Sequence, residues 1–414
     1  MRPLEGIRVV DFGWVAVGPV LSSLLAEFGA EVIKVESSRR LDYCRLIPTP
    51  LSEEERISDA FAPRAGQIDR VPLFHQYNRG KLGITVDLRH PRAPELLKRL
   101  VAKSDVVVEN FSPRVLREVG LDYPTLAKVK PDLIMISCSA VGHGGPWEEV
   151  RTFAPSLSSL AGLERLIGYP AERCLGALTF GYADPSNAHH GLFAVLAALW
   201  HRQHTGEGQW IDMSQLEATA GLAGEALMDY FMNGRVWDTQ GFTHGTLAPH
   251  GIYPCRGEDE WVALACQTEA EWRGLCQAMG DPTWCREPRF RDLQRRRQSR
   301  ETLDRLIAEW TRTFSAAEVA SRCQAAGVPA SPVLGLEAHA SHPYFQSRGT
   351  LASVTHAVLG SLSLYTSPIK LQATPGKIQR PAPCLGEDNH LIFRDLLGLA
   401  PDEIERLQAD QLLR

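Results

Sequence analysis

One acidic residue has the surroundings that a carboxylate nucleophile needs. Asp184 lies in GYADPSNAHHG, directly before a proline and a long helix-forming segment. Asp followed by Pro is a preferred opening of a helix, so we expect Asp184 at the N-cap and Pro185 at the first helical position. The helix dipole favours an ionised carboxylate there, and some enzymes use such a group as a covalent nucleophile. The structural and chemical roles are compatible, and the spacing alone favours the structural one.

The segment Phe12–Pro19 (FGWVAVGP) offers a second candidate site. It follows the β-branched run Ile7–Asp11 and precedes a helix and then a strand that ends in Glu36, where a Rossmann acidic residue would contact ribose. Its glycines form G-x4-G rather than GxGxxG, and no Lys-Ser or Lys-Thr follows, so the dinucleotide signature is weak. Backbone N–H groups at the start of the helix can still receive a phosphate. A NAD-dependent dehydrogenase is the alternative that a titration with NADH tests.

Three polar turns complete the set of candidates. Asn78–Lys81 (NRGK) and Asn110–Arg117 (NFSPRVLR) are cationic loops beside predicted strands, and open α/β sheets bind ligands where their strands end. Ordinary turn chemistry explains both loops equally well. Gly142–Trp147 (GHGGPW) is a tight turn that either brings a ligand close to the backbone or simply reverses the chain.

Composition excludes several classes of function. The 44 Lys and Arg against 49 Asp and Glu leave a formal charge of -5, so we expect no nucleic-acid partner. No apolar run approaches the roughly 20 residues that cross a bilayer, and the first residues lack the apolar core of a signal peptide. We therefore expect no membrane association and a cytoplasmic protein. The nine cysteines form no CxxC pair and have no histidines at zinc spacing, which favours reduced, mostly buried thiols and no metal.

The elements that must position these residues alternate between strands and helices. Such alternation predicts a parallel, doubly wound sheet. The predicted strands are Ile7–Asp11, Ala30–Glu36, Leu82–Leu88, Asp105–Glu109, Asp132–Ser137 and Gln209–Met213. The predicted helices are Val20–Phe28, Arg92–Ala102, Val115–Val119, Pro185–His204 and Gln215–Asn233.

The second half of the chain changes character. Arg235–Gly327 is turn-rich, contains the alternating strand Trp261–Ala265, and has an Arg-rich run at 289–300 that we interpret as a solvated helix face. A strand at Leu362–Tyr365 and a helix at Asn389–Leu397 follow. We therefore predict a large domain at 1–205, a linker helix at 206–234, a small α+β domain at 235–330, and a return to the large domain at 331–414.

Several longer phrases together resemble one protein family. The chain is similar to the class III CoA-transferases, the group that contains formyl-CoA:oxalate and carnitine CoA-transferases and the α-methylacyl-CoA racemases. The likeness covers essentially the whole chain in the family's order. The phrases are PLEGIRVVDF, GAEVIKVE, NRGKLGITVDLRHP, DVVVENFSPRVLREVGLDY, ALWHRQHTGEGQWIDMSQLEA, HGIYPCRGEDEWVALA, GVPASPV and APCLGED.

The resemblance implies a fold and a site. The fold is a Rossmann-like large domain with a parallel sheet, built from both chain ends, with an inserted smaller α+β domain, in a dimer of interlocked rings. It makes Asp184 the catalytic carboxylate and a CoA thioester the substrate, with no permanently bound cofactor. The implied CoA contacts are Trp14, Val15, Ala16, Val17, Gly18, Asn78, Arg79, Lys81, Asn110 and Phe111.

The chain departs from the family pattern at the expected phosphate contacts. After the second strand it has Ser37-Ser38 and then Arg39, and Arg117 is displaced by one position from the usual arginine. We still expect both arginines to contact CoA. The segment Gly245–Gly251 is the nearest match to the family's glycine-rich lid.

A third departure separates two reactions. The racemases carry His-Asp a short way after the glycine turn, and the corresponding residues here are Phe153 and Ala154. Neither can take a proton, so the two-base exchange that racemisation needs loses one base. This favours a transferase; a racemase or epimerase that uses Asp184 with His143 is the alternative.

The expected enzyme moves CoA from an acyl-CoA, with succinyl-CoA as one candidate donor, to a free carboxylic acid. It does so through an aspartyl mixed anhydride and an aspartyl-CoA thioester, and Gly142, Gly144 and Gly145 are expected to stabilise the oxyanions. We expect a homodimer; pairing with a paralogue, or a CoA-binding subunit of a heteromeric enzyme, is the alternative. The residues Phe153, Phe180 and Tyr182 hint at an aromatic acceptor, and Arg151 at a second carboxylate, although core packing and a surface arginine explain them better.

Overall fold

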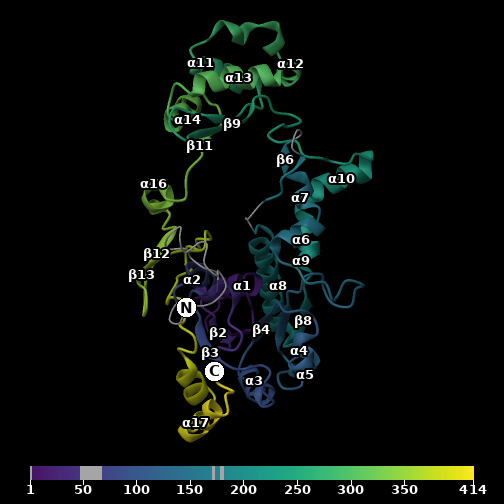
Figure 1. Cartoon of the computed structure of the whole chain (residues 1–414), viewed down its shortest axis with the longest axis vertical. Coiled ribbons are helices and arrows are strands. Elements are labelled where there is room, and N and C mark those ends of the chain that lie inside the picture. The colour runs from purple at the N-terminus through teal and green to yellow at the C-terminus, as the bar shows by residue number, and fades with distance from the viewer. Residues whose placement is uncertain (1, 47–67, 170–172, 178–180) are drawn as a thin grey trace, which may run out of the picture. The chain divides into compact units, whose positions relative to one another are not determined.

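The computed structural model describes residues 2–46, 68–169, 173–177 and 181–414. The chain divides into two compact units, which are labelled by element in Figure 1. Unit 1 comprises Met1–Glu164, Ala177–Arg235 and Pro343–Arg414, and unit 2 comprises Arg165–Gly176 and Val236–His342. The predicted small domain spans 235–330, whereas unit 2 runs to residue 342 and includes 165–176. The residues predicted as a linker helix belong to unit 1.

Unit 1 is built on a six-stranded sheet in the order β3-β2-β1-β4-β5-β8, and all paired strands are parallel. The sheet has β2 on one side of β1 and β4 on the other, so the strand order reverses at β1. Open sheets of this kind bind ligands beyond the carboxyl ends of the strands at that reversal. The strands are β1 (Arg8–Asp11), β2 (Glu31–Glu36), β3 (Leu82–Thr85), β4 (Val106–Glu109), β5 (Ile134–Ser137) and β8 (Gln209–Asp212).

Alternating side chains of the central strands form two cores, one on each face of the sheet. Val9 packs on one face against α1 (Val17–Glu27) and α8 (Ala183–Thr205), which lie side by side. Val10 packs on the other face against α3 (Ala93–Val101) and α17 (Pro401–Ala409). The period of two along a strand explains the division, because neighbouring residues point to opposite faces. Residues from the C-terminal segment thus complete the core of unit 1.

The remaining elements of unit 1 are short. They are η1 (Tyr43–Arg45), α2 (Pro72–Asn78), α4 (Val115–Glu118), α5 (Tyr123–Leu126), α6 (Ala154–Leu160), α9 (Gln215–Ala220), η3 (Gly221–Ala223), α10 (Gly224–Asn233), α16 (Pro343–Ser347), β12 (Leu351–His356), β13 (Gly360–Tyr365) and the π-helical segment Leu391–Leu396. The helix α7 (Leu163–Leu166) crosses the boundary between the units. Three predictions differ from the structure. The single helix predicted over Gln215–Asn233 is divided into α9, η3 and α10. The strand predicted to reach Leu88 ends at Thr85, and the predicted C-terminal helix Asn389–Leu397 is the π-helical segment.

Unit 2 pairs three antiparallel strands with helices. The strands β9 (His250–Pro254), β10 (Trp261–Ala265) and β11 (Ala330–Pro332) bury side chains against the helices, chiefly from alternate positions such as Val262 and Leu264. The other elements are β6 (Gly168–Tyr169), β7 (Arg173–Cys174), α11 (Glu269–Ala278), η4 (Thr283–Arg286), η5 (Pro288–Phe290), α12 (Leu293–Gln298), α13 (Arg300–Thr311), α14 (Ala316–Ala325) and α15 (Ala338–Ser341).

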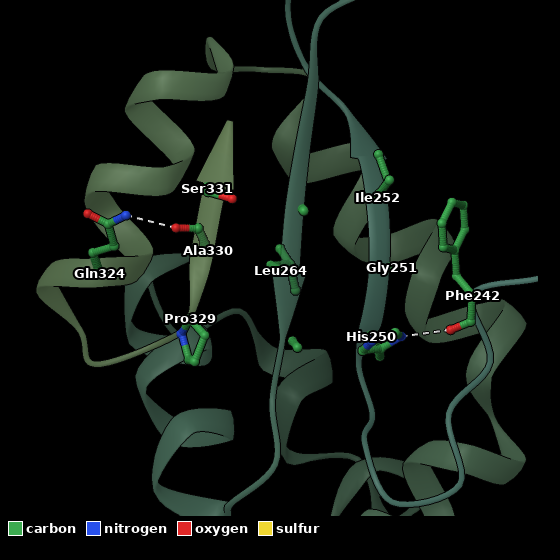
Figure 2. A pocket seen from close by; sticks show the side chains of 11 residues that line it. Phe242, His250, Gly251, Ile252, Leu264, Gln324, Pro329, Ala330 and Ser331 are labelled. Atoms are coloured by element: carbon green, nitrogen blue, oxygen red, sulfur yellow. Dashed lines mark hydrogen bonds between the residues drawn. The ribbon is translucent and has the colours of Figure 1, made fainter. Parts of the chain in front are cut away.

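A hollow of about 630 Å³ lies along the sheet of unit 2, and Figure 2 shows its lining. Among the described residues that line it, His250 is the one titratable group, and the Nδ1 atom of this ring lies 2.8 Å from the carbonyl oxygen of Phe242. The rest of the lining is largely apolar, with Ile252 and Ala263 from adjacent strands. A lining without a carboxylate or a thiol offers little for covalent acyl chemistry.

Within the described residues, no helix is both long enough and apolar enough to span a bilayer. The same residues contain no group of three or more His, Cys, Asp or Glu side chains that could hold a metal ion. None of the nine cysteines, all of which lie in the described part of the chain, forms a disulfide; Cys174 is exposed, Cys384 is half-buried, and the others are buried.

Candidate active site

Asp184 lies inside the first turn of α8 rather than at its cap. The helix begins at Ala183 with Tyr182 at the N-cap, so the prediction that Asp184 is the N-cap residue is wrong. Pro185 is the third helical residue, and proline is tolerated there because the first N–H groups of a helix have no intrahelical partner. The side chain of Asp184 is therefore not needed to cap the helix.

Burial sets the ionisation of Asp184. Burial among the described residues removes water from this half-buried carboxyl group, and this desolvation raises its pKa to about 6. The helix N-terminus favours the charged form, but the loss of water has the larger effect. A carboxylate with this pKa is mostly ionised at pH 7 and less solvated than a surface aspartate, as a nucleophile requires.

Two side chains that sequence reasoning missed lie within reach of the charge of Asp184. Desolvation is the main cause that raises the pKa values of the Cys44 thiol and the Tyr77 phenol, and the negative charge of Asp184 contributes to both. Cys44 belongs to η1 and Tyr77 to α2, and the two pack in one cluster with Val15. Neither residue stands in a motif, so no local signal could have identified it.

The start of α8 also borders the residues that decide between racemase and transferase. Ala154 is buried in one cluster with Ala183, and a Cβ atom added to Gly181 would lie 3.3 Å from that of Ala154. Phe153 is exposed, with its ring centroid 6.2 Å from that of Tyr43. The positions expected to carry His-Asp in a racemase thus adjoin the start of α8, and here neither side chain titrates.

The loop between β1 and α1 is held by buried side chains. Asp11 accepts the N–H of Gly13 at 2.7 Å, and the ammonium group of Lys34 donates to the carbonyl of Gly13 at 2.8 Å. Asn110 accepts the N–H of Trp14 at 2.7 Å and donates to its carbonyl at 2.8 Å. These backbone groups are therefore already occupied and are not available to bind a phosphate.

The next residue, Val15, has an unusual backbone conformation. Its φ of 65° lies in the left-handed region, which β-branched residues rarely adopt. Asp42 accepts its N–H at 3.2 Å, and the thiol of Cys44 donates to its carbonyl at 3.1 Å. Strain of this kind persists only where surrounding contacts hold it, and such places are often functional.

The NRGK loop supports this region from inside the protein. The ammonium group of Lys81 is fully buried and donates at 2.8 Å to both Asp11 and Asn78. Arg79 is buried as well and pairs with Glu27 at 3.1 Å. Desolvation lowers the pKa of Lys81 to about 8, against the opposing effect of Asp11. Any influence of Asn78, Arg79 and Lys81 on CoA would therefore act through the loop that they support.

A cavity of about 350 Å³ lies beyond the carboxyl ends of β1, β2 and β4. It brings together three of the predicted CoA contacts, Trp14, Arg39 and Phe111. Arg40, which we did not predict, places its guanidinium group 4.5 Å from the centroid of the Trp14 ring. Arg89 also lines the cavity. Cationic groups beside aromatic faces suit a nucleotide with phosphates.

The other predicted contacts occupy different surroundings. Ala16, Val17 and Gly18 are buried where α1 begins. The Arg117 side chain is exposed, 3.8 Å from Glu148, and it is not part of the cavity lining.

The glycine turn is anchored to β8. Gly142 and Gly144 have φ values of 81° and 78°, and only glycine adopts these readily. Between them, His143 places its backbone N–H 3.1 Å and its Nδ1 atom 2.9 Å from Asp212. A Cβ atom added to Gly144 or Gly145 would meet nothing within 4 Å.

The parallel sheet, the half-buried carboxylate and a cavity lined by both basic and acidic side chains define an α/β protein with a candidate site for acyl transfer. The sequence profile described as CoA-transferase family III matches residues 4–389. The chain therefore belongs to this family, it is a transferase, and CoA-transferases use CoA thioesters as substrates.

Individual relatives agree with the family. The succinyl-CoA–D-citramalate CoA-transferase of Chloroflexus aurantiacus is 33% identical over 412 residues, which cover 100% of this chain and 98% of the relative. The succinyl-CoA–L-malate CoA-transferase alpha subunit from the same organism is 30% identical and covers 99% of this chain and 92% of its own. The crystal structure of a CaiB/BaiF family protein from Brucella suis has a TM-score of 0.84 and 29% identity, covering 95% of this chain and 99% of that one. These likenesses support the mixed α/β fold with its parallel central sheet.

Proposed function

We propose that this enzyme transfers CoA from an acyl-CoA donor to a free carboxylic acid, with Asp184 as the group that is transiently acylated. The observation that supports this most directly is the carboxylate of Asp184, half-buried in the first turn of α8, with a raised pKa. Such a group is reactive toward a thioester carbonyl and ionised at neutral pH. Succinyl-CoA is the proposed donor, because the names of the relatives given above specify it as theirs.

The reaction proceeds in four substitutions at carbonyl carbons. A carboxylate oxygen of Asp184 attacks the donor thioester, the C–S bond breaks, and CoA thiolate leaves a mixed anhydride on the enzyme. The thiolate attacks the aspartyl carbonyl and expels the donor acid as a carboxylate. The acceptor carboxylate then attacks the aspartyl-CoA thioester, and the released thiolate attacks the acceptor acyl group, which regenerates Asp184. One thioester is exchanged for another, so the reaction is nearly balanced in free energy.

The cavity beyond β1, β2 and β4 is the proposed site for the nucleotide part of CoA. Arg39, Arg40 and Arg89 would neutralise phosphates, and Trp14 and Phe111 would contact the adenine ring. The Gly142–Gly145 turn is the proposed donor of N–H groups to the tetrahedral oxyanions. Exclusion of water from the anhydride requires that the site be closed during turnover.

The proposed oligomer is a homodimer. Large apolar side chains are exposed on the chain by itself along α8 and α10, among them Phe193 at 76%, Trp200 at 67% and Phe231 at 70%. Apolar surface of this size usually marks a protein interface. A relative whose name denotes an alpha subunit makes pairing with a paralogue the alternative.

A racemase is the second candidate, and the structure offers little to support it. Phe153 and Ala154 adjoin the start of α8, and neither side chain has a group that can donate or accept a proton. His143, the remaining base, is paired with Asp212. Incorporation of solvent deuterium at the α-carbon of an acyl-CoA, without any acceptor acid, would favour the racemase.

The decisive experiment traps the acylated enzyme. The purified protein is treated with succinyl-CoA, then with hydroxylamine or borohydride, and the modified peptide is located by mass spectrometry. We expect the modification on Asp184 and a loss of transfer by at least about 10³-fold in Asp184→Ala. The Asp388→Asn variant, which lacks a different buried carboxylate, should still acquire the adduct. Full turnover by Asp184→Ala would contradict the proposal.

A further inference from the structure

The buried carboxylate of Asp42 joins three separate segments near the nucleophile. It is 1% exposed, and its Oδ1 atom accepts the backbone N–H groups of Val15 at 3.2 Å and Cys44 at 2.9 Å. Its Oδ2 atom accepts the ammonium group of Lys34 at 3.0 Å. Lys34 is fully buried in β2 and also donates to the carbonyl of Gly13. One side chain thus connects the β1–α1 loop, the η1 turn and the sheet.

The pairing with Asp42 keeps the ammonium group of Lys34 charged although it is fully buried. Desolvation by itself would lower the pKa of Lys34, but the carboxylates of Asp42, Glu36 and Asp11 outweigh it and raise the pKa to about 12. Removing one partner of a buried pair leaves the other charge uncompensated. The conformation of the β1–α1 loop therefore depends on both Asp42 and Lys34.

The η1 turn that Asp42 holds is linked to the start of α8 by side-chain contacts: the ring of Tyr43 lies 6.2 Å from that of Phe153, and the next residue, Ala154, packs in one cluster with Ala183. Val15 and Tyr77 both pack against the buried cluster that contains Cys44, and the charge of Asp184 contributes to the raised pKa values of Cys44 and Tyr77 after desolvation. Val15 keeps its left-handed conformation through two contacts, the carboxylate of Asp42 and the thiol of Cys44. A shift of the loop by about one ångström would therefore change the space beside the nucleophile.

We propose that Asp42, paired with Lys34, is a positioning residue for acyl transfer: it holds Val15 and the Cys44 turn in place near the start of α8, which carries the nucleophile. The inference rests on the proposed role of Asp184. Misplacement of a reacting group by about 1 Å can cost a factor of about 10² in rate. We expect Asp42→Asn to lower kcat by about 10- to 100-fold; because Asp42 also lines the proposed nucleotide cavity, KM for the acyl-CoA should rise as well, but by a smaller factor than kcat falls.

The variants are chosen to break one contact at a time. In Asp42→Asn the amide oxygen can still accept the N–H groups of Val15 and Cys44, but the amide nitrogen faces the ammonium group of Lys34, donor against donor. Lys34→Met removes the ammonium group and leaves the carboxylate. The matched control is Asp388→Asn, because Asp388 is also a buried carboxylate that accepts a backbone N–H, from Gly83 at 2.7 Å, and pairs with an arginine.

A second measurement separates positioning from general loss of structure. Cys44 and Cys138 are both fully buried, and Cys44 is the one that contacts the loop that Asp42 holds. We follow alkylation of each thiol by iodoacetamide with peptide mapping. In Asp42→Asn and Lys34→Met, Cys44 should react at least about tenfold faster, with Cys138 unchanged, because only a local opening exposes it. Asp388→Asn should change neither kcat nor the ratio of the two thiols.

Three results would overturn the inference. These are a kcat for Asp42→Asn within about twofold of the wild type, equal acceleration of both thiols, or a KM increase without a change in kcat. Trapping at Asp184 in the wild-type enzyme is scored separately. An absent adduct there would reject the proposed function, whereas the thiol ratio reports the loop contact in either case.

Discussion

At the scale of single residues, burial decides the chemistry of the candidate site. Asp184 has a raised pKa although it lies at the positive end of a helix, because desolvation exceeds the effect of the dipole. Lys81 shows the same effect with the opposite sign, since burial lowers its pKa to about 8. A sequence motif identifies the type of group, but only its surroundings set its protonation.

The ionisation of Asp184 predicts a pH dependence. With a pKa of about 6, the reactive carboxylate is the minor form below that pH, so single-turnover acylation should fall about tenfold per unit of pH once the pH is well below 6. Stopped-flow measurements of CoA thiolate release between about pH 4.5 and 8 test this. An acylation rate that is flat from about pH 5 to 8 would show that Asp184 is not the titrating nucleophile.

The same shift has a consequence for stability. Because the folded-state pKa lies above the value of 3.8 in an unfolded chain, ionisation of Asp184 destabilises the fold, and this effect is fully present above about pH 6. It disappears as the pH falls from about 6 to about 3.8. Asp184→Asn, which cannot ionise, is therefore the control: its Tm should exceed that of the wild type at about pH 8 and the difference should shrink by about pH 4.5.

At the scale of elements, the start of α1 depends on a close approach of backbones. A Cβ atom added to Gly18 would lie 2.8 Å from the Cα atom of Gly13 and 3.3 Å from Oδ1 of Asn110. Asn110 is the side chain that holds both backbone groups of Trp14. Glycine at this position therefore permits the packing that shapes the cavity.

Gly18→Ala should displace this loop. We expect the affinity for CoA to fall by about tenfold and the free energy of unfolding to fall by about 1–3 kcal/mol, as for overpacking in a dense interior. Calorimetric titration with CoA and denaturant unfolding measure the two effects. Gly224→Ala, where a Cβ atom meets nothing within 4 Å, is the control and should change neither. Unaltered CoA affinity in Gly18→Ala would contradict the proposed place of the nucleotide.

At the scale of the whole molecule, the apolar surface of α8 and α10 predicts an assembly. Replacing Phe193 and Trp200 by glutamate should convert the proposed dimer to monomers, because it places charges in a surface that must be desolvated on association. Light scattering coupled to size-exclusion chromatography measures the mass. Glutamate at Ile369, a large apolar residue exposed in the C-terminal segment, is the control. Wild-type protein that runs as a monomer at all concentrations would reject the homodimer.

Much of the fold of unit 1 could be predicted from local sequence. The strands β1, β2, β4 and β5 are short β-branched or aliphatic runs, and burial on both faces of a parallel sheet favours such runs over an alternating pattern. The boundaries were less predictable. Leu82–Leu88 reads as one apolar strand, yet β3 ends at Thr85, where its pairing with β2 also ends.

Some residues of the candidate site could also be predicted from the sequence, and others could not. The type of Asp184 and its place at the start of a long helix are local properties, and the family phrases are continuous in sequence, so both could be read from the chain. Cys44 and Tyr77 could not, because η1 and α2 bring them into one cluster, and within reach of the charge of Asp184, only in the folded chain. The NRGK loop was expected to contact a ligand, but its Lys81 is buried. The partner of Lys81 is Asp11, which is 70 residues away in the sequence, so no local pattern could indicate this pairing.

The sequence by itself determined the alternation of strands and helices, the nucleophile candidate and the family, since each depends on neighbouring residues or on their order. Only the tertiary structure decided which charges are buried, which side chains the charge of Asp184 affects, and that Asp42 and Lys34 join three segments. Desolvation and hydrogen bonding between distant residues depend on packing, and packing leaves no local pattern in the chain.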